Sequence, residues 1–141
     1  MNQEIVNSLG EVIDYAFHEG SDRNYHLLIV GHSVTGDMDD SLVLNLAQKV
    51  SEQGISVLRF SFPGNGNSGG RFDQCTITKE IEDLRCIVTA VKERGWRPIY
   101  AGHSMGACVG ALTAAVDSRI ELLISLAGIT NTKNFLESEF A

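Results

Sequence analysis

The stretch Ile99-Tyr100-Ala101-Gly102-His103-Ser104-Met105-Gly106-Ala107 decides the fold, because it sets a Gly-x-Ser-x-Gly pentapeptide between two different hydrophobic patterns. Residues 98–101 form a short apolar run that is typical of a buried strand, and residues 107–115 are small residues in a helical pattern. A serine at such a strand-to-helix corner adopts a strained backbone conformation that exposes its hydroxyl. The context therefore predicts that Ser104 is a nucleophile at the start of a helix.

The residues around Ser104 have different predicted roles. Gly102 and Gly106 are needed because a Cβ atom at either position would collide across the turn. The helix that follows directs its free N–H groups and the positive end of its dipole toward the corner. His103 adjoins Ser104 in sequence, but the turn directs its side chain away from the hydroxyl. We therefore expect His103 to have a role in loop or pocket structure rather than as the base.

Length and composition predict one domain spanning residues 1–141, with 43% hydrophobic and 21% charged residues. A formal net charge of −7 argues against nucleic acid and anionic membranes as partners, since polyphosphate binding requires clustered Lys and Arg. No apolar run reaches membrane-spanning length, and the N-terminal residues lack the basic and apolar regions of a signal peptide. We therefore expect a cytoplasmic protein.

The cysteines and histidines give no sign of a disulfide framework or a metal site. Cys75, Cys86 and Cys108 are an odd number and are widely spaced, without any C-x-x-C pair. Cys86 and Cys108 fall in helical apolar patterns, so we expect them to be buried packing residues. No pair of His or Cys residues has the spacing of zinc ligands, so no metal is expected.

Hydrophobic periodicity alternates between strands and helices after a strand-rich start. Predicted strands cover residues 4–6, 11–17, 26–30, 55–62, 97–101 and 121–129, and predicted helices cover residues 39–53, 77–91 and 107–115. The first two strands are expected to form a hairpin, and the last dozen residues a loop or short helix. This alternation predicts an α/β fold with a doubly wound, mostly parallel sheet and an N-terminal antiparallel hairpin.

Three motifs follow successive predicted strands: Gly31-His32-Ser33-Val34-Thr35-Gly36-Asp37, then Phe62-Pro63-Gly64-Asn65-Gly66-Asn67-Ser68, then Gly102-His103-Ser104-Met105-Gly106. In this order and spacing they are similar to the oxyanion loop, the Gly-x-Gly-x-Ser loop and the nucleophile elbow of one family. Over nearly its whole length the chain resembles the α/β-hydrolase superfamily, in particular its serine esterase or lipase-like and serine aminopeptidase-like members. One departure is Ser33, which stands where the family has glycine and restricts the φ angle there.

The resemblance implies acyl transfer by a serine hydrolase of the carboxylesterase type. Ser104 would attack the carbonyl of an ester, thioester or amide, and water would then hydrolyse the acyl-enzyme. By resemblance, the backbone N–H groups of Val34 and Met105 would form the oxyanion hole, supported by the loop at Gly31 and His32. For His32, a hydrogen bond within its own loop and a direct part in catalysis are both open. The expected partner is a small-molecule acyl substrate, without a cofactor.

The family's triad acid and histidine normally follow later strands than those predicted here. No carboxylate follows the last predicted strand until Glu137, and His18 and His26 lie near the N-terminus. We therefore expect this chain to be the N-terminal part of a longer hydrolase, ending after about the sixth strand and lacking the triad acid and histidine. Its last strand would be an unpaired edge, which favours a homo-oligomer.

Two other functions are open alternatives. Gly64, Gly66 and Gly69 match the Gly-x-Gly-x-x-Gly fingerprint of dinucleotide-binding proteins, with Asp83 further along the chain. That fingerprint requires a helix that begins within the glycines, whereas residues 71–75 intervene, and Asp83 is predicted on the helix face away from the apolar stripe. The other alternative is a non-catalytic binding module on a hydrolase scaffold, because a fold does not guarantee an activity.

Overall fold

The computed structural model describes residue 1 and residues 3–139. The strands are β1 (Ile5–Val6), β2 (Val12–Ile13), β3 (Tyr15–His18), β4 (His26–Gly31), β5 (Ser56–Phe60), β6 (Arg97–His103) and β7 (Leu122–Leu126). The α-helices are α1 (Ser41–Glu52), α2 (Ile77–Glu93), α3 (Met105–Val116) and α4 (Thr132–Glu139), with a 3-10 turn, η1 (Phe72–Gln74), before α2.

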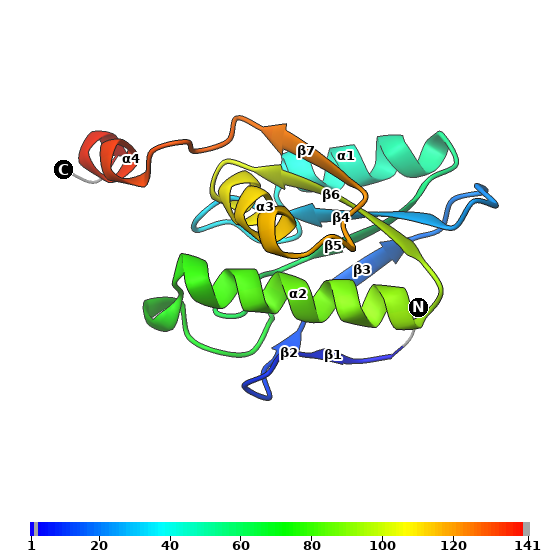
Figure 1. The fold of residues 1–141 in the computed structure, drawn as a ribbon, viewed down its shortest axis with the longest axis horizontal. Helices are drawn as coiled ribbons and strands as arrows, with labels where there is room; N and C mark the ends of the chain where they lie inside the picture. The colour runs from blue at the N-terminus through cyan, green and yellow to red at the C-terminus, as the bar shows by residue number, and fades with distance from the viewer. Residues whose placement is uncertain (2, 140–141) are drawn as a thin grey trace.

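Five strands form one sheet in the order β3-β5-β4-β6-β7, and β1 and β2 form a separate antiparallel hairpin (Figure 1). The β5, β4, β6 and β7 strands are parallel to their neighbours, and β3 is antiparallel to β5. The β4 strand lies in the centre because its residues are apolar on both faces, as in strands that are covered by helices on both sides. The predicted α/β fold class is therefore confirmed.

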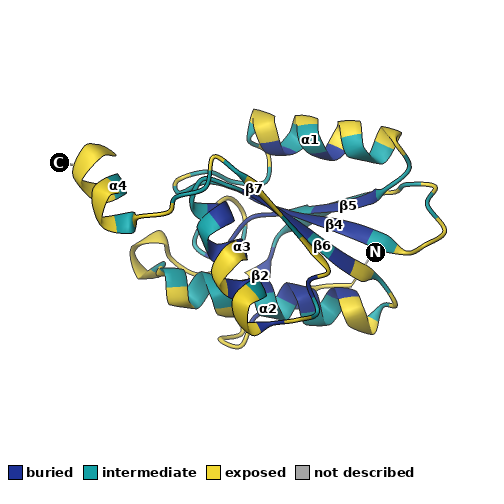
Figure 2. Ribbon diagram, turned by 45° about the horizontal axis from the view of Figure 1, so that its top comes forward, coloured by how far each residue is buried: buried dark blue, intermediate teal, exposed yellow. Residues whose placement is uncertain are grey.

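The helices cover the sheet from both sides, with α1 on one face and α2 and α3 on the other (Figure 2). Alternate side chains of β4 enter the two cores. Leu28 and Val30 pack with Val43 and Ala47 of α1. On the other face the core holds the apolar stripe of α2, and its members include Leu27, Ile29, Leu84, Ile87, Val88, Val91 and Tyr100.

The predicted strand at residues 11–17 is two strands, which is a difference from the sequence prediction. Asp14 interrupts it, because its N–H donates to the Ser68 hydroxyl (2.8 Å) and its carbonyl accepts from the N–H of Ser61 (3.0 Å). The residues before Asp14 pair in the hairpin and those after it pair with β5. Ser61 and Ser68 belong to the glycine-rich loop after β5 (residues 61–71). Their hydrogen bonds to Asp14 therefore mark the point where the chain passes from the hairpin into the sheet.

The predicted helices at residues 39–53, 77–91 and 107–115 end within two residues of α1, α2 and α3. Thr76 caps α2 by accepting a hydrogen bond from the N–H of Lys79 (3.1 Å). The C-terminal segment forms α4, although residues 140–141 lie outside the described part.

The expectation for Cys86 and Cys108 was wrong, because both side chains are only half-buried.

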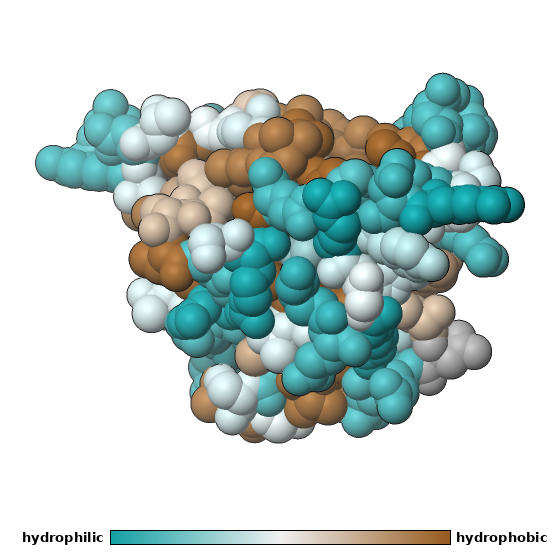
Figure 3. Space-filling view, turned by 45° about the vertical axis from the view of Figure 1, so that its right-hand side comes forward, coloured by the Kyte–Doolittle hydropathy of each residue, from teal (hydrophilic) through white to brown (hydrophobic). Residues whose placement is uncertain are grey.

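One edge of the sheet carries exposed apolar side chains. Leu122 and Ile124 of β7 are exposed, as are Leu112 and Val116 of α3. Figure 3 shows apolar side chains gathered along the upper part of the molecule, where Figure 1 places β7 and α3. In the described part of the chain, β7 pairs with β6 alone, so its other edge is open. None of the helices in that part is long and apolar enough to cross a membrane.

Candidate active site

Strand register brings two of the three sequence motifs together. The β4 and β6 strands are parallel neighbours, and Gly31 at the end of β4 is opposite Gly102 near the end of β6. The loop after β4 and the corner after β6 therefore leave the sheet side by side, at its carboxyl edge. Crevices at this edge are where open α/β sheets place their ligands.

Ser104 occupies a strained corner between β6 and α3. Its φ is 53° and its ψ is −110°, a combination that residues with a Cβ atom rarely adopt. Its N–H donates to the carbonyl of Leu126 in β7 (2.9 Å), which fixes the corner against the neighbouring strand. The Ser104 side chain does not cap α3, and within residues 1 and 3–139 its hydroxyl has no hydrogen-bond partner.

Gly102 and Gly106 allow the close contacts that the corner requires. A Cβ atom at Gly102 would overlap the carbonyl of Gly106, and a Cβ atom at Gly106 would lie 2.5 Å from the carbonyl oxygen of His32. Beneath them the buried Tyr100 hydroxyl donates to the Gly106 carbonyl (2.8 Å), and it also occupies the space that a Cβ atom at Gly31 would need. The corner and the loop after β4 therefore pack on the same tyrosine.

The expected oxyanion donors, Val34 and Met105, line the same pocket. Among the residues that the structure describes, neither N–H group is engaged in a hydrogen bond. Met105 is the first residue of α3, so its N–H belongs to the unpaired first turn of that helix. The positive φ in the Val34 loop falls on Thr35 (62°) and not on Ser33, so serine is tolerated where the family has glycine.

His32 is a structural residue in this arrangement. Its Nδ1 hydrogen-bonds the carbonyl of Ser33 (2.7 Å), and its Nε2 accepts from the N–H of Phe62 (2.9 Å). Both ring nitrogens are therefore occupied, and the ring is neutral with the proton on Nδ1. Burial lowers the pKa of His32, although the Ser33 carbonyl and two nearby aspartates oppose this effect. The histidine thus ties the loop after β4 to the loop after β5.

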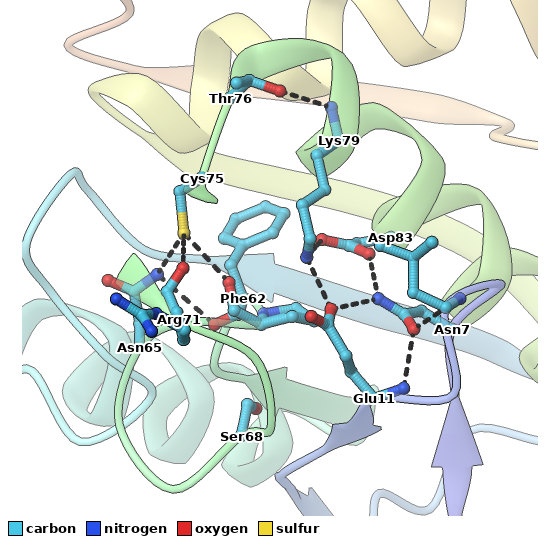
Figure 4. Close-up of polar contacts among 12 residues, drawn as sticks. Asn7, Glu11, Phe62, Asn65, Ser68, Arg71, Cys75, Thr76, Lys79 and Asp83 are labelled. Atoms are coloured by element: carbon cyan, nitrogen blue, oxygen red, sulfur yellow. Dashed lines mark hydrogen bonds and ion pairs between the residues drawn. The ribbon is translucent and has the colours of Figure 1, made fainter. Parts of the chain in front are cut away.

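The glycine-rich loop after β5 does not have dinucleotide-binding geometry. Gly64 and Gly66 have positive φ values of 95° and 52°, and the loop closes on itself through the Gly64 N–H to the Gly69 carbonyl (2.7 Å). Cys75 fastens the end of the loop, because its thiol donates to the Pro63 carbonyl (3.2 Å; Figure 4). The α2 helix begins only after this point, so its N-terminus is not formed by the glycines.

A largely buried ionic cluster that includes Asp83 fixes the first turns of α2 to the hairpin. Asp83 is 2% exposed, because the hairpin covers this face of α2. Lys79 forms ion pairs with Glu11 (2.7 Å) and Asp83 (3.1 Å), and the Asn7 amide donates to both carboxylates at 2.7 Å (Figure 4). The orientation of α2 about its axis is therefore fixed by these four residues.

A pocket of about 310 Å³ lies beside the corner and is lined mostly by apolar side chains. Its walls include Val34 and Met105, together with Phe72, Ile77 and Leu136, whereas Ser104 itself does not line it. Another pocket of about 320 Å³ shares Thr35, Asn65 and Phe72 with the first and is lined by the loop after β4 and by the glycine-rich loop after β5.

The sequence analysis missed Glu80, which is the acidic residue lining the first pocket. Burial, reinforced by the Asp83 carboxylate and opposed by Lys79, raises the pKa of Glu80 to about 7. A signal for it exists in the sequence. Glu80 lies three residues after Ile77 and four before Leu84, so it belongs to the apolar stripe of α2.

The structure does not bring a histidine to the Ser104 hydroxyl in the described part of the chain. His18 accepts from the Arg59 side chain (2.9 Å) and His26 pairs with Asp22 (3.3 Å). His103 lies at the end of β6, opposite Leu126. Among the same residues, no group of three His, Cys, Asp or Glu side chains could hold a metal ion.

This combination of a mostly parallel sheet, helices on both faces and a serine on a strained corner after the strand β6 defines the α/β-hydrolase class. A family model described as serine aminopeptidase, S33, matches residues 39–138. The chain belongs to this family.

Several known proteins are similar to this chain. Bovine (Bos taurus) palmitoyl-protein thioesterase ABHD10, mitochondrial, is 25% identical over 104 residues, which are 74% of this chain and 33% of that protein. Est1E from Butyrivibrio proteoclasticus, solved with ferulic acid bound, has a TM-score of 0.82 and 24% identity, covering 89% of this chain and 52% of that chain. XC6422 from Xanthomonas campestris, described as an α/β serine hydrolase without lid, has a TM-score of 0.74 and 29% identity, covering 87% and 58%. The chain therefore spans about a third to somewhat more than half of the length of these proteins.

Proposed function

We propose that Ser104 is the nucleophile of a serine hydrolase that cleaves carboxylic esters or thioesters through an acyl-enzyme. The observation that carries this proposal is the strained corner itself, because a cost of about 1–3 kcal/mol in backbone strain persists only where the surrounding structure imposes it. Amide substrates remain within the same chemistry. The names of two similar proteins concern carboxylic acyl groups, a palmitoyl thioester for the bovine protein and ferulic acid for Est1E.

In the proposed reaction the Ser104 oxygen forms a bond to the substrate carbonyl carbon while its proton passes to a base. The backbone N–H groups of Val34 and Met105 would hold the resulting oxyanion. Removing one side-chain donor from the oxyanion hole of a comparable enzyme costs about 3–4 kcal/mol. The tetrahedral intermediate then expels the alcohol or thiol, which takes up the proton. Water subsequently hydrolyses the acyl-enzyme, releasing the acid and restoring the serine hydroxyl.

The base in this proposal is a histidine from outside the 141 residues, supported by an acid. We place the base outside these residues because both ring nitrogens of His32 are already hydrogen-bonded. Within the described residues, none of the other histidines is hydrogen-bonded to Ser104. Loss of the base in a related triad lowers turnover by about 10⁶, so we expect this chain alone to retain slow chemistry at most.

A fluorophosphonate probe tests the nucleophile, with intact-mass detection over hours. We expect labelling of one site that disappears in Ser104→Ala and is retained in Ser33→Ala, a matched change in the adjoining loop. If Ser33→Ala and Ser104→Ala label equally, the nucleophile assignment is wrong. If a longer protein that contains these residues also fails to react, the non-catalytic binding module becomes the better description.

The bovine relative is named as a mitochondrial protein, whereas the sequence of this chain predicts a cytoplasmic one. Cytoplasmic localisation therefore stays a prediction.

A further inference from the structure

The first pocket combines an apolar wall with a single acidic side chain. Val34, Phe72, Ile77, Met105 and Leu136 supply apolar surface, and Glu80 enters from the first turn of α2. Its volume of about 310 Å³ is at the lower end of the range for small-molecule sites, about 300–1,000 Å³. The pocket is therefore large enough for a short aliphatic chain. Its lining also includes uncharged polar residues (Thr35, Asn65, Thr76 and Thr132), and Glu80 is the charged residue among those that line it.

The Glu80 carboxylate has no hydrogen-bond or ion-pair partner among the described residues, although burial raises its pKa. Its neighbour Lys79 is occupied by Glu11 and Asp83 on the hairpin side of α2. Adjacent helical residues lie about 100° apart around the axis, so fixing Lys79 toward the hairpin leaves Glu80 on the pocket side. Helix orientation thus places a carboxylate in the pocket without giving it a partner.

Three titratable side chains interact electrostatically with Glu80: Cys75 just before α2, Tyr100 of β6 and Cys108 of α3. Burial, and to a smaller extent the Glu80 carboxylate, raise the pKa of the Cys75 thiol, the Cys108 thiol and the Tyr100 hydroxyl. None of these side chains donates a hydrogen bond to Glu80 in the described structure. Glu80 is only half-buried, so solvent still reaches its carboxylate, and a ligand that fills the pocket must replace that solvent with a hydrogen-bond donor of its own.

We propose that Glu80 selects substrates whose aliphatic chain ends in a hydrogen-bond donor, an ammonium or a hydroxyl group, and rejects chains that end in a carboxylate. The proposal deepens the proposed function, because it names the chemistry of the group that would enter the pocket beside Ser104. An ammonium gives the carboxylate an opposite charge and a donor, and a hydroxyl gives the donor alone. A carboxylate would place a second negative charge in an apolar site.

The test uses binding rather than turnover, so that it does not depend on the reactivity of Ser104. Three ligands of equal chain length, n-pentylamine, 1-pentanol and pentanoate, are titrated into the isotope-labelled chain at pH 8 and followed by NMR. We expect n-pentylamine to bind at least about tenfold more tightly than pentanoate, with 1-pentanol between them, and shifts centred on Ile77 and Met105.

Two substitutions separate charge from hydrogen bonding. Glu80→Gln keeps an acceptor oxygen, so we expect it to weaken n-pentylamine about tenfold and to change 1-pentanol less than about threefold. Glu80→Leu removes both properties and should weaken both ligands. Glu82→Gln is the matched control, because it removes the same charge from an exposed position on α2 and should leave all three affinities unchanged.

Two results would overturn the proposal. One is equal affinity of wild type for n-pentylamine and pentanoate. The other is an equal loss of n-pentylamine binding in Glu80→Gln and Glu82→Gln, which would mean that only the net charge matters. Fluorophosphonate labelling of Ser104 is read separately, so failure of the nucleophile and failure of the Glu80 site give different results.

Discussion

Replacing Ser104 by glycine should make the protein more stable while it removes the proposed nucleophile. The φ and ψ of 53° and −110° cost a residue with a Cβ atom about 1–3 kcal/mol, and glycine adopts them without that cost. Glycine also adds freedom to the unfolded chain, which offsets about 0.4–1 kcal/mol. The hydroxyl neither caps α3 nor bonds another described residue, so nothing else is lost. We expect a net gain of about 1 kcal/mol.

Thermal and urea unfolding measure this gain, which corresponds to a rise in Tm of about 4 °C for a domain of this size. Ser104→Ala is the first control, because it removes the hydroxyl but keeps the Cβ atom and the strain, and should be close to wild type. Ser33→Gly is the second, since φ at Ser33 is not positive, and it should lower stability by about 0.5–1 kcal/mol. If Ser104→Gly is as destabilising as Ser33→Gly, the corner is not strained and the argument for a nucleophile fails.

Three other predictions concern the cluster, the buried histidine and the sheet edge. Lys79→Met should lower the free energy of unfolding in urea by about 3 kcal/mol, because the carboxylates of Glu11 and Asp83 lose their shared cation. A decrease below about 1 kcal/mol would contradict the role of the cluster. Since burial lowers the pKa of His32, the unfolded chain binds the proton first as pH falls, so the stability of wild type relative to His32→Gln should decrease below the ordinary value of 6.5. A constant difference between pH 8 and pH 5 would show that the Phe62 N–H does not need the neutral ring. Wild type should self-associate in sedimentation velocity and Ile124→Lys should not, whereas a monodisperse wild type would contradict association through β7.

Features with a local cause were predictable from the sequence. The corner at Ser104 follows from two glycines between a strand pattern and a helix pattern. Parallel register then places Gly31 opposite Gly102, which brings the loops together without any long-range signal in the residues themselves.

Features that depend on distant packing were not predictable in the same way. The burial of Asp83 needs Asn7, 76 residues earlier in the chain, and the break at Asp14 needs the hydroxyl of Ser68. A helical stripe says which side chains face inward, but it does not say that a hairpin will cover a second face. Glu80 differs from these, because its place on the stripe could have been noticed from spacing alone.

The Tyr100 hydroxyl makes three positions of the chain interdependent. The hydroxyl occupies the space that a Cβ atom at Gly31 would need, and it donates a hydrogen bond to the carbonyl of Gly106. The Tyr100 ring occupies the space that a Cβ atom at Gly110 would need. A methyl group at Gly31 should therefore be tolerated better in a Tyr100→Phe background, while the phenylalanine alone leaves a buried carbonyl without its donor. Libraries that vary these sites one at a time would discard pairs that work together, so redesign of the corner at Ser104 should begin with joint substitution.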